Sequence, residues 1–252
     1  MVYHVIFSPT GGTMQAAELL ADAFQEPAAQ IDLTDVSVDT QQYPFSEGDI
    51  CIVAVPSFGG RVPNAAIARL GRMRGNGARA VLLVAYGNRA YEDTLLELKN
   101  TLTDAGFCCV AAVAAVAEHS IMRQFASGRP DRQDEAELRN FGRKIWQKLQ
   151  AGTKTIVSVP GNFPYREYGG LPMKPKAGMS CTKCGLCAEK CPVGAIPKES
   201  PEKTDTAACM TCMRCVSICP QHARKLNSLL VAAGAQKLKK VCMERKVNEL
   251  FL

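Results

Sequence analysis

The sequence predicts an α/β protein in which a parallel sheet is followed by a small cysteine-rich domain, and three observations support this. Residues 1–150 alternate apolar runs with segments of helical periodicity, as in sheets whose strands are joined by helices. Prolines and glycines then interrupt residues 160–175, and a cysteine motif occurs twice beyond residue 180. We therefore expect a sheet domain over residues 1–150, a linker over 151–178, a cysteine-rich domain over 179–226 and a C-terminal helix over 227–252.

The apolar runs predict a doubly wound parallel sheet of five strands, at Val2–Phe7, Gln30–Leu33, Asp49–Val55, Arg79–Ala85 and Phe107–Ala117. Helical spacing of apolar residues predicts helices at Thr13–Phe24, after Pro63, at Glu92–Ala105, at Asp134–Gln150 and at Ser228–Leu252. Residues 34–48 show no period. The connection between the second and third strands is therefore expected to contain a very short helix or none.

Composition and charge set limits on the class of protein. Twelve of the 252 residues are cysteine, and the chain opens without an export-like charged and apolar segment. We therefore expect a cytoplasmic protein with reduced, metal-bound thiols rather than disulfides. The longest apolar run, Cys108–Ala117, is too short for the roughly 20 residues that span a bilayer. Residues 1–150 carry 14 Lys and Arg against 17 Asp and Glu, whereas residues 151–252 carry 16 against 7.

The cysteine motif reads C-x2-C-x2-C-x3-C-P in both copies, which are offset by 28 residues. Three thiolates at this spacing bind one side of a 4Fe-4S cube, and in a duplicated chain the fourth binds the other cube. This predicts two ligand sets: Cys181, Cys184, Cys187 and Cys219 for cluster I, and Cys209, Cys212, Cys215 and Cys191 for cluster II. Structural zinc is the alternative, but it favours separated C-x2-C pairs or mixed Cys and His ligands. Over Met179–Leu226 the chain resembles bacterial two-cluster ferredoxins, which implies a small α+β domain.

The clusters change the interpretation of the basic second half. Each 2+ core with four thiolates carries about −2, which lowers the charge of residues 151–252 from +9 to about +5. A nucleic-acid partner is then unnecessary. Lys183, Lys190, Arg214 and Arg224 are interpreted as neighbours that set the field at the clusters, as a docking surface, or as a solvated face.

The loop after the first strand, Ser8-Pro9-Thr10-Gly11-Gly12-Thr13, has the composition of an anion site. It lacks the Lys-Ser/Thr pair of a P-loop, and its two adjacent glycines only half match a dinucleotide motif, although Asp32 fits that motif's acidic position. Hydroxyls and N–H groups at a helix N-terminus also bind a phosphate monoester without lysine. In this respect the loop resembles the phosphate loop of flavodoxins.

Two further loops, Val55–Pro63 and Ala85–Asp93, pair glycine with an aromatic residue after the third and fourth strands. Ligands of doubly wound sheets bind at these strand ends. By position Phe58 and Tyr91 resemble the two flavodoxin residues that sandwich the flavin ring; two ordinary turns with surface aromatics are the alternative. The resemblance implies that FMN is bound by Ser8, Thr10, Gly11, Gly12, Thr13, Pro56, Ser57, Phe58, Gly59, Gly60, Arg61, Tyr86, Gly87, Asn88, Arg89 and Tyr91.

Charged and aromatic residues near these loops suggest additional roles. Arg61 and Arg89 replace the acidic surroundings usual in flavodoxins, so we expect them to stabilise a fully reduced anionic flavin. Glu118 and His119 end the fifth strand, where they either donate protons to a substrate or cap the strand. Tyr165 and Tyr168 in the linker either cover the flavin or pack between the domains.

The whole chain resembles the fused flavodoxin-ferredoxin proteins of anaerobic bacteria. This resemblance implies electron transfer between FMN and two 4Fe-4S clusters, coupling two-electron flavin chemistry to one-electron carriers or a partner protein. The alternative is a ferredoxin-linked flavin reductase that acts on a small-molecule acceptor. A flavin-free scaffold that carries only clusters is a third hypothesis.

Overall fold

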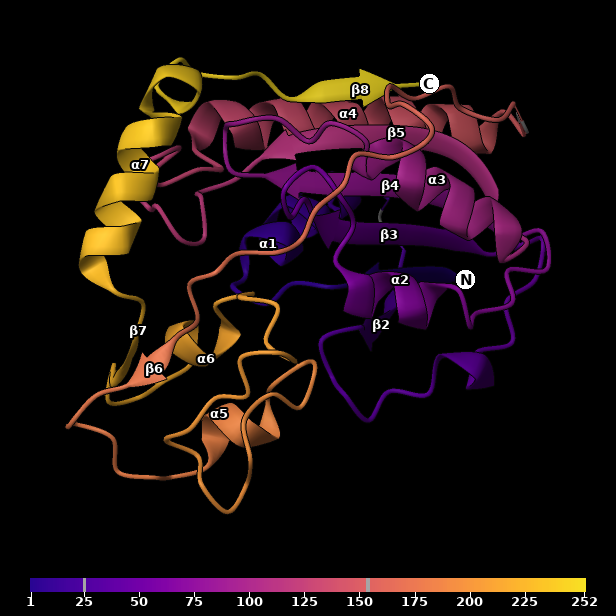
Figure 1. Cartoon of the computed structure of the whole chain (residues 1–252). Helices are drawn as coiled ribbons and strands as arrows, with labels where there is room; N and C mark the ends of the chain where they lie inside the picture. The colour runs from indigo at the N-terminus through magenta and orange to yellow at the C-terminus, as the bar shows by residue number, and fades with distance from the viewer. Residues whose placement is uncertain (25, 153–154) are drawn as a thin grey trace.

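In a computed structural model, which describes residues 1–24, 26–152 and 155–252, the chain forms a six-stranded sheet joined to a small cysteine-rich domain (Figure 1). The strands are β1 (Val2–Ile6), β2 (Ala28–Asp32), β3 (Ile50–Pro56), β4 (Arg79–Tyr86), β5 (Cys108–Val116) and β8 (Glu249–Phe251). Their order is β2-β1-β3-β4-β5-β8, and the first five are parallel. The order 2-1-3-4-5 is that of the flavodoxin-like doubly wound fold, as predicted.

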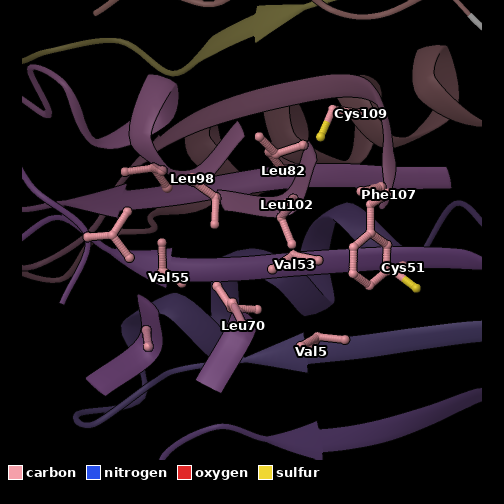
Figure 2. Packing of buried hydrophobic residues seen from close by; sticks show 14 of the residues in the cluster. Val5, Cys51, Val53, Val55, Leu70, Leu82, Leu98, Leu102, Phe107 and Cys109 are labelled. Carbon is pink, nitrogen blue, oxygen red and sulfur yellow. The ribbon is translucent and has the colours of Figure 1, made fainter. Parts of the chain in front are cut away.

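Helices cover both faces of the sheet. The helices α2 (Asn64–Leu70) and α3 (Thr94–Asp104) pack on one face, while α1 (Gly12–Ala21) and α4 (Arg132–Gln150) pack on the other. Side chains along a strand point alternately to the two faces, so that Val53 and Leu82 meet Leu98 on the first face (Figure 2). Each fully buried side chain of this size contributes roughly 1.5–3 kcal/mol. Packing on both faces therefore holds the strands, and with them the starting points of the loops that follow, in defined positions.

Most elements of the first 150 residues match the prediction, and the connection between β2 and β3 contains only the short 3-10 helix η1 (Thr40–Gln42). One difference concerns the start of α3, which begins at Thr94, whereas the predicted helix begins at Glu92. Asp93 precedes this helix but does not cap it, because its carboxylate accepts hydrogen bonds from the N–H groups of Asn162 (2.8 Å) and Arg166 (2.7 Å). The loop after β4 therefore anchors the linker.

The linker runs along the sheet before it reaches the second domain (Figure 1). Residues 153 and 154 of the predicted linker, 151–178, lie outside the described residues. At its start the Val157 N–H donates to the Cys109 carbonyl at 2.9 Å, beside β5. Together with the Asp93 contacts, this holds the linker across the side of the sheet that carries α3.

The cysteine-rich domain has few regular elements. It contains the helices α5 (Leu186–Glu189) and α6 (Arg214–Ser217) and a two-stranded antiparallel ribbon of β6 (Lys176–Ala177) and β7 (Arg224–Lys225). It lies beyond the carboxyl ends of the parallel strands (Figure 1). The expected small α+β domain is therefore present.

The end of the chain departs from the prediction. A single helix over 227–252 is wrong, because α7 (Ser228–Cys242) stops and β8 returns to the sheet antiparallel to β5. The prediction of a five-stranded sheet is corrected for the same reason. The turn between α7 and β8 is held from within the first domain, where the Arg129 guanidinium donates to the Lys246 carbonyl at 2.9 Å. In the sequence, nothing local to residues 243–248 indicates these distant partners.

Candidate functional site

The eight motif cysteines surround two cavities. One, cavity I, is lined by Cys181, Cys184, Cys187 and Cys219, and the other, cavity II, by Cys191, Cys209, Cys212 and Cys215. In each cavity three cysteines come from one motif and the fourth from the other. The structure thus brings together the two sets that the spacing predicted for clusters I and II.

The donor atoms fit an iron-sulfur cluster. Each cavity offers four cysteine sulfurs, three from one motif and one from the other, which is the donor set of a 4Fe-4S cluster. Backbone N–H groups of Ala195 and Ala223 donate to the Cys191 and Cys219 sulfurs, both at 3.3 Å. Donors of this kind stabilise the thiolates that hold a cluster.

Burial distinguishes the two cavities. Cys184 of cavity I is exposed, whereas Cys191 and Cys212 of cavity II are buried. Burial raises the pKa of Cys212 to about 11, so this thiol stays protonated near neutral pH until a metal replaces the proton. Cavity I therefore lies at the surface, and cavity II lies between it and the sheet.

A third cavity, the strand-end cavity, lies at the carboxyl ends of β1, β3, β4 and β5. Its walls include Thr10, Gly12, Thr13, Pro56, Ser57, Phe58, Tyr86, Gly87, Glu118 and His119, all predicted site residues. Cys212 of cavity II completes the wall. One cysteine thus belongs to both cavities, so that a predicted cluster ligand lies at the edge of the sheet where the sequence predicts the flavin site.

The loop before α1 is the segment that the sequence predicts to bind a phosphate. Gly11 has φ +97°, a conformation that favours glycine, and the Ser8 hydroxyl oxygen accepts a hydrogen bond from the Met14 N–H at 3.0 Å. The Met14 N–H is thus occupied by Ser8, whereas the earlier N–H groups of the first turn have no acceptor within the helix, and such groups at a helix N-terminus can bind an anion. Gly11 lines a cleft on the outer side of this loop, together with Thr10 and Gly12.

A neighbouring space, the side cavity, extends from the strand-end cavity toward the linker and α7. Phe58, Gly59, Gly87, Arg89 and His119 line it, all of them predicted residues. Tyr168 from the linker forms another wall and packs on Gly59, where any larger residue would collide with its ring. Met210, Thr211 and Leu238 were not predicted, because the first two fill the variable positions between Cys209 and Cys212 and the third is one apolar residue of the predicted C-terminal helix.

His119 is held in one tautomer. Its Nδ1 accepts hydrogen bonds from the N–H groups of Ile121 (3.2 Å) and Met122 (3.3 Å), which leaves the proton of the neutral ring on Nε2. Burial, aided by the positive charge of Arg89, lowers the pKa of His119 below its usual 6.5. His119 is therefore a neutral donor beside both cavities.

Glu118 is poorly suited to donate protons. Burial alone would raise its pKa, but the Gly128 N–H (2.9 Å) and the Arg123 guanidinium lower it overall. The carboxylate stays ionised at neutral pH and ties the loop after β5 together.

Five predicted residues do not line these cavities, and the first, Ser8, instead accepts the Met14 N–H at the start of α1. Arg61 forms a two-pronged ion pair with Glu97 (2.9 and 2.5 Å), and Tyr91 donates to the Glu249 carboxylate of β8 at 3.1 Å. The Asn88 side chain binds the turn after α7. A Cβ at Gly60 would collide with Glu92 and Arg166, so Gly60 serves the packing of the linker.

The structure also gives Arg89 and Tyr165 partners that the sequence did not predict. Arg89 lines the side cavity, but its guanidinium binds the Glu92 carboxylate at 2.9 and 2.6 Å. The Tyr165 hydroxyl accepts a hydrogen bond from Asn100 at 2.7 Å, and its ring stacks near Arg61 rather than over the strand ends. Both arginines pair with carboxylates, and their expected effect on a reduced anionic flavin stays a prediction.

The fold and the cavities together define a flavodoxin-like domain joined to an iron-sulfur domain. Residues 180–224 match the family of 4Fe-4S dicluster domains. No curated protein sequence matches the chain. Among the described helices, none is both long and apolar enough to cross a bilayer.

Solved structures similar to this chain align with its first part. A flavodiiron core from Synechocystis is 18% identical with a TM-score of 0.44, and the alignment covers 60% of this chain but only 36% of that one. A Streptococcus pneumoniae flavodoxin is 18% identical (TM-score 0.43; 61% and 100% covered). A Megasphaera elsdenii flavodoxin is 14% identical (TM-score 0.40; 58% and 99% covered).

Proposed function

We propose that this protein transfers electrons between FMN, bound in the strand-end cavity, and two 4Fe-4S clusters held in cavities I and II. The observation that carries this proposal is the position of Cys212, which lines both cavity II and the strand-end cavity. Electron transfer is the chemistry of 4Fe-4S domains, and residues 180–224 match one.

The residues at the strand ends fit FMN. Thr10, Gly11, Gly12 and Thr13 would hold the phosphate, and the strand-end wall of Pro56, Phe58, Tyr86 and Gly87 would receive the flat ring. The neutral Nε2–H of His119 would donate to an acceptor atom of the ring. When bound, FMN supplies two-electron chemistry, whereas each cluster carries one electron.

The order of the cavities supports a route through the molecule. Cys184 exposes cavity I to solvent, cavity II lies further in, and the strand-end cavity follows. A soluble one-electron carrier in the cytoplasm would therefore exchange electrons at cavity I. The linker and α7 would keep water from the flavin end.

A flavin reductase is the second candidate, and the side cavity favours it. This space borders the proposed ring site and presents His119, Arg89 and Tyr168 to a small molecule. Turnover of such a molecule by the loaded protein, with a reduced ferredoxin as electron donor, would distinguish a reductase from a carrier.

The test is anaerobic purification followed by metal, sulfide and flavin analysis. We expect ~8 iron per chain and one FMN. A Gly87→Val variant should keep the iron but lose FMN, because a Cβ there would lie 2.8 Å from the Cβ of His119. Gly48→Val, which has open space around its Cβ, is the control and should keep both. Zinc in place of iron, or wild-type protein without flavin, would contradict the proposal.

A further inference from the structure

The two cysteine motifs are structural repeats as well as sequence repeats. Residues offset by 28 make the same contact: the Ala195 and Ala223 N–H groups each donate to the sulfur four residues earlier, at 3.3 Å in both cases. The residue that follows differs between the repeats. Ile196 in the first motif corresponds to Arg224 in the second.

Both of these residues are buried against a cavity. Ile196, 4% exposed, packs in the apolar cluster around Cys191 and lines cavity II. Arg224, only 2% exposed, lines cavity I, and its Nε donates to the Cys187 sulfur at 3.3 Å. The second repeat thus places a cation where the first places an alkyl group.

The other donors of Arg224 bind neutral atoms. They contact the carbonyls of Pro175 (3.4 Å), Pro201 and Lys203 (2.9 Å) and the hydroxyl of Thr204 (2.8 Å). In the described part of the chain no carboxylate forms an ion pair with Arg224, and the nearby Glu202 pairs with Lys183 instead. A buried charge without a counter-ion costs several kcal/mol.

Cavity II has cations of its own, but they bind oxygen. Lys174 donates to the Cys209 carbonyl (2.6 Å) and the Thr211 hydroxyl (3.2 Å), and Arg214 contacts the Pro9 carbonyl at 3.5 Å. The direct contact between a buried guanidinium and a ligand sulfur belongs to cavity I.

We propose that Arg224 is the built-in counter-charge of cluster I and raises its reduction potential. This inference rests on the proposed function, since it requires a cluster in cavity I. One electron from an external donor changes the cluster and its four thiolates from about −2 to about −3, with no bond made or broken. A fixed cation in contact with a ligand sulfur stabilises the added negative charge.

The experiment is a redox titration of the two clusters, followed by electron paramagnetic resonance, in four iron-quantified proteins. They are the wild type, Arg224→Ile, Arg224→Lys and Lys225→Met. Isoleucine is the residue that the first repeat already accommodates at this position, and Lys225 is the exposed neighbour that controls for loss of one charge.

In Arg224→Ile we expect one of the two midpoint potentials to become clearly more negative and the other to shift less, because Arg224 contacts a sulfur of cavity I but acts on Cys215 of cavity II only through its charge. Arg224→Lys and Lys225→Met should keep both potentials near the wild-type values. Unchanged potentials in Arg224→Ile, an equal shift in Lys225→Met, or the same shift in Arg224→Lys would overturn the inference.

If Arg224→Ile does not assemble its clusters, the iron content of the variants tests the inference instead. Loss of iron in Arg224→Ile but not in Arg224→Lys supports the counter-charge, whereas equal loss in both variants contradicts it. A wild-type protein without iron would refute the proposed function itself. If the wild type contains iron and the midpoint potentials of the variants are not shifted, only the role of Arg224 is refuted.

Discussion

The Asn88 side chain donates a hydrogen bond of 2.7 Å to the backbone carbonyl of Cys242, at the end of α7. It also donates to the Glu244 carbonyl (2.8 Å) and accepts from the Lys246 N–H (3.0 Å). The loop after β4, which follows Gly87 of the strand-end cavity, is therefore also the anchor of the C-terminal segment. The cysteine-rich domain is held on both sides, by the linker and by this segment.

Replacing Asn88 by alanine should loosen this anchor. The change leaves buried backbone groups without partners, which costs about 1–3 kcal/mol. Urea unfolding followed by circular dichroism measures the loss. Asn64→Ala, at an exposed helix start, is the control. Equal stability of the two variants would show that the Asn88 contacts do not hold the segment.

The buried ion pair between Arg129 and Asp134 should matter far more than a surface pair. Their side chains are 5% and 0% exposed, and Asp134→Asn leaves a buried guanidinium without its anion. We expect a loss of about 3–5 kcal/mol in unfolding free energy. Asp22→Asn breaks the exposed pair with Arg139 (3.0 Å) and should cost far less, because solvent screens this pair. Similar losses in both variants would contradict this ranking.

Acid should destabilise the protein through Asp134. Burial would raise its pKa, but Arg129, the Asp131 N–H and Asn248 lower it overall. A carboxyl with a lower pKa in the folded state contributes stability above its unfolded value of about 3.9, and this is lost as the pH falls through the folded pKa. Melting temperatures measured between about pH 7 and pH 3 should fall less steeply in Asp134→Asn than in the wild type. Parallel curves would exclude Asp134 as a cause.

His119 should bind FMN through its neutral Nε2–H. In His119→Ala, loss of one hydrogen bond of about 1 kcal/mol should raise the Kd roughly fivefold. His119→Gln, which keeps an N–H donor, should recover part of the affinity. Because the pKa of His119 is lowered, wild-type affinity should stay constant above about pH 6.5. Flavin fluorescence titration measures the Kd of FMN for the wild type and for both variants. An unchanged Kd in His119→Ala would show that His119 does not bind FMN.

The sequence was informative where local patterns decide the structure. Alternating apolar and helical segments predicted the parallel strands and therefore the edge at which their loops meet. Motif spacing also predicted how the cysteines divide between two cavities. Both features can be read from short patterns in the chain, and the duplication of the cysteine motif also predicts that each fourth cysteine joins the other set.

The sequence was less informative where contacts between residues far apart in the chain determine the structure. Tyr91 turns toward Glu249, and Asn88 toward the turn after α7, because the chain returns to the sheet after more than 150 residues. The strand β8 has only three residues, too few to show a period. Arg61 is paired by Glu97 from a neighbouring helix, which the loop composition did not reveal.

The most direct test of the account is the rate of electron transfer between flavin and clusters in the fully loaded protein. After rapid reduction at one end, the flavin and cluster absorbances should change together with one first-order rate that is independent of protein concentration. Gly87→Val, with clusters but no FMN, should show only the cluster change. A rate that scales with protein concentration, or a flavin that stays oxidised while the clusters are reduced, would contradict electron transfer through the cavity wall at Cys212.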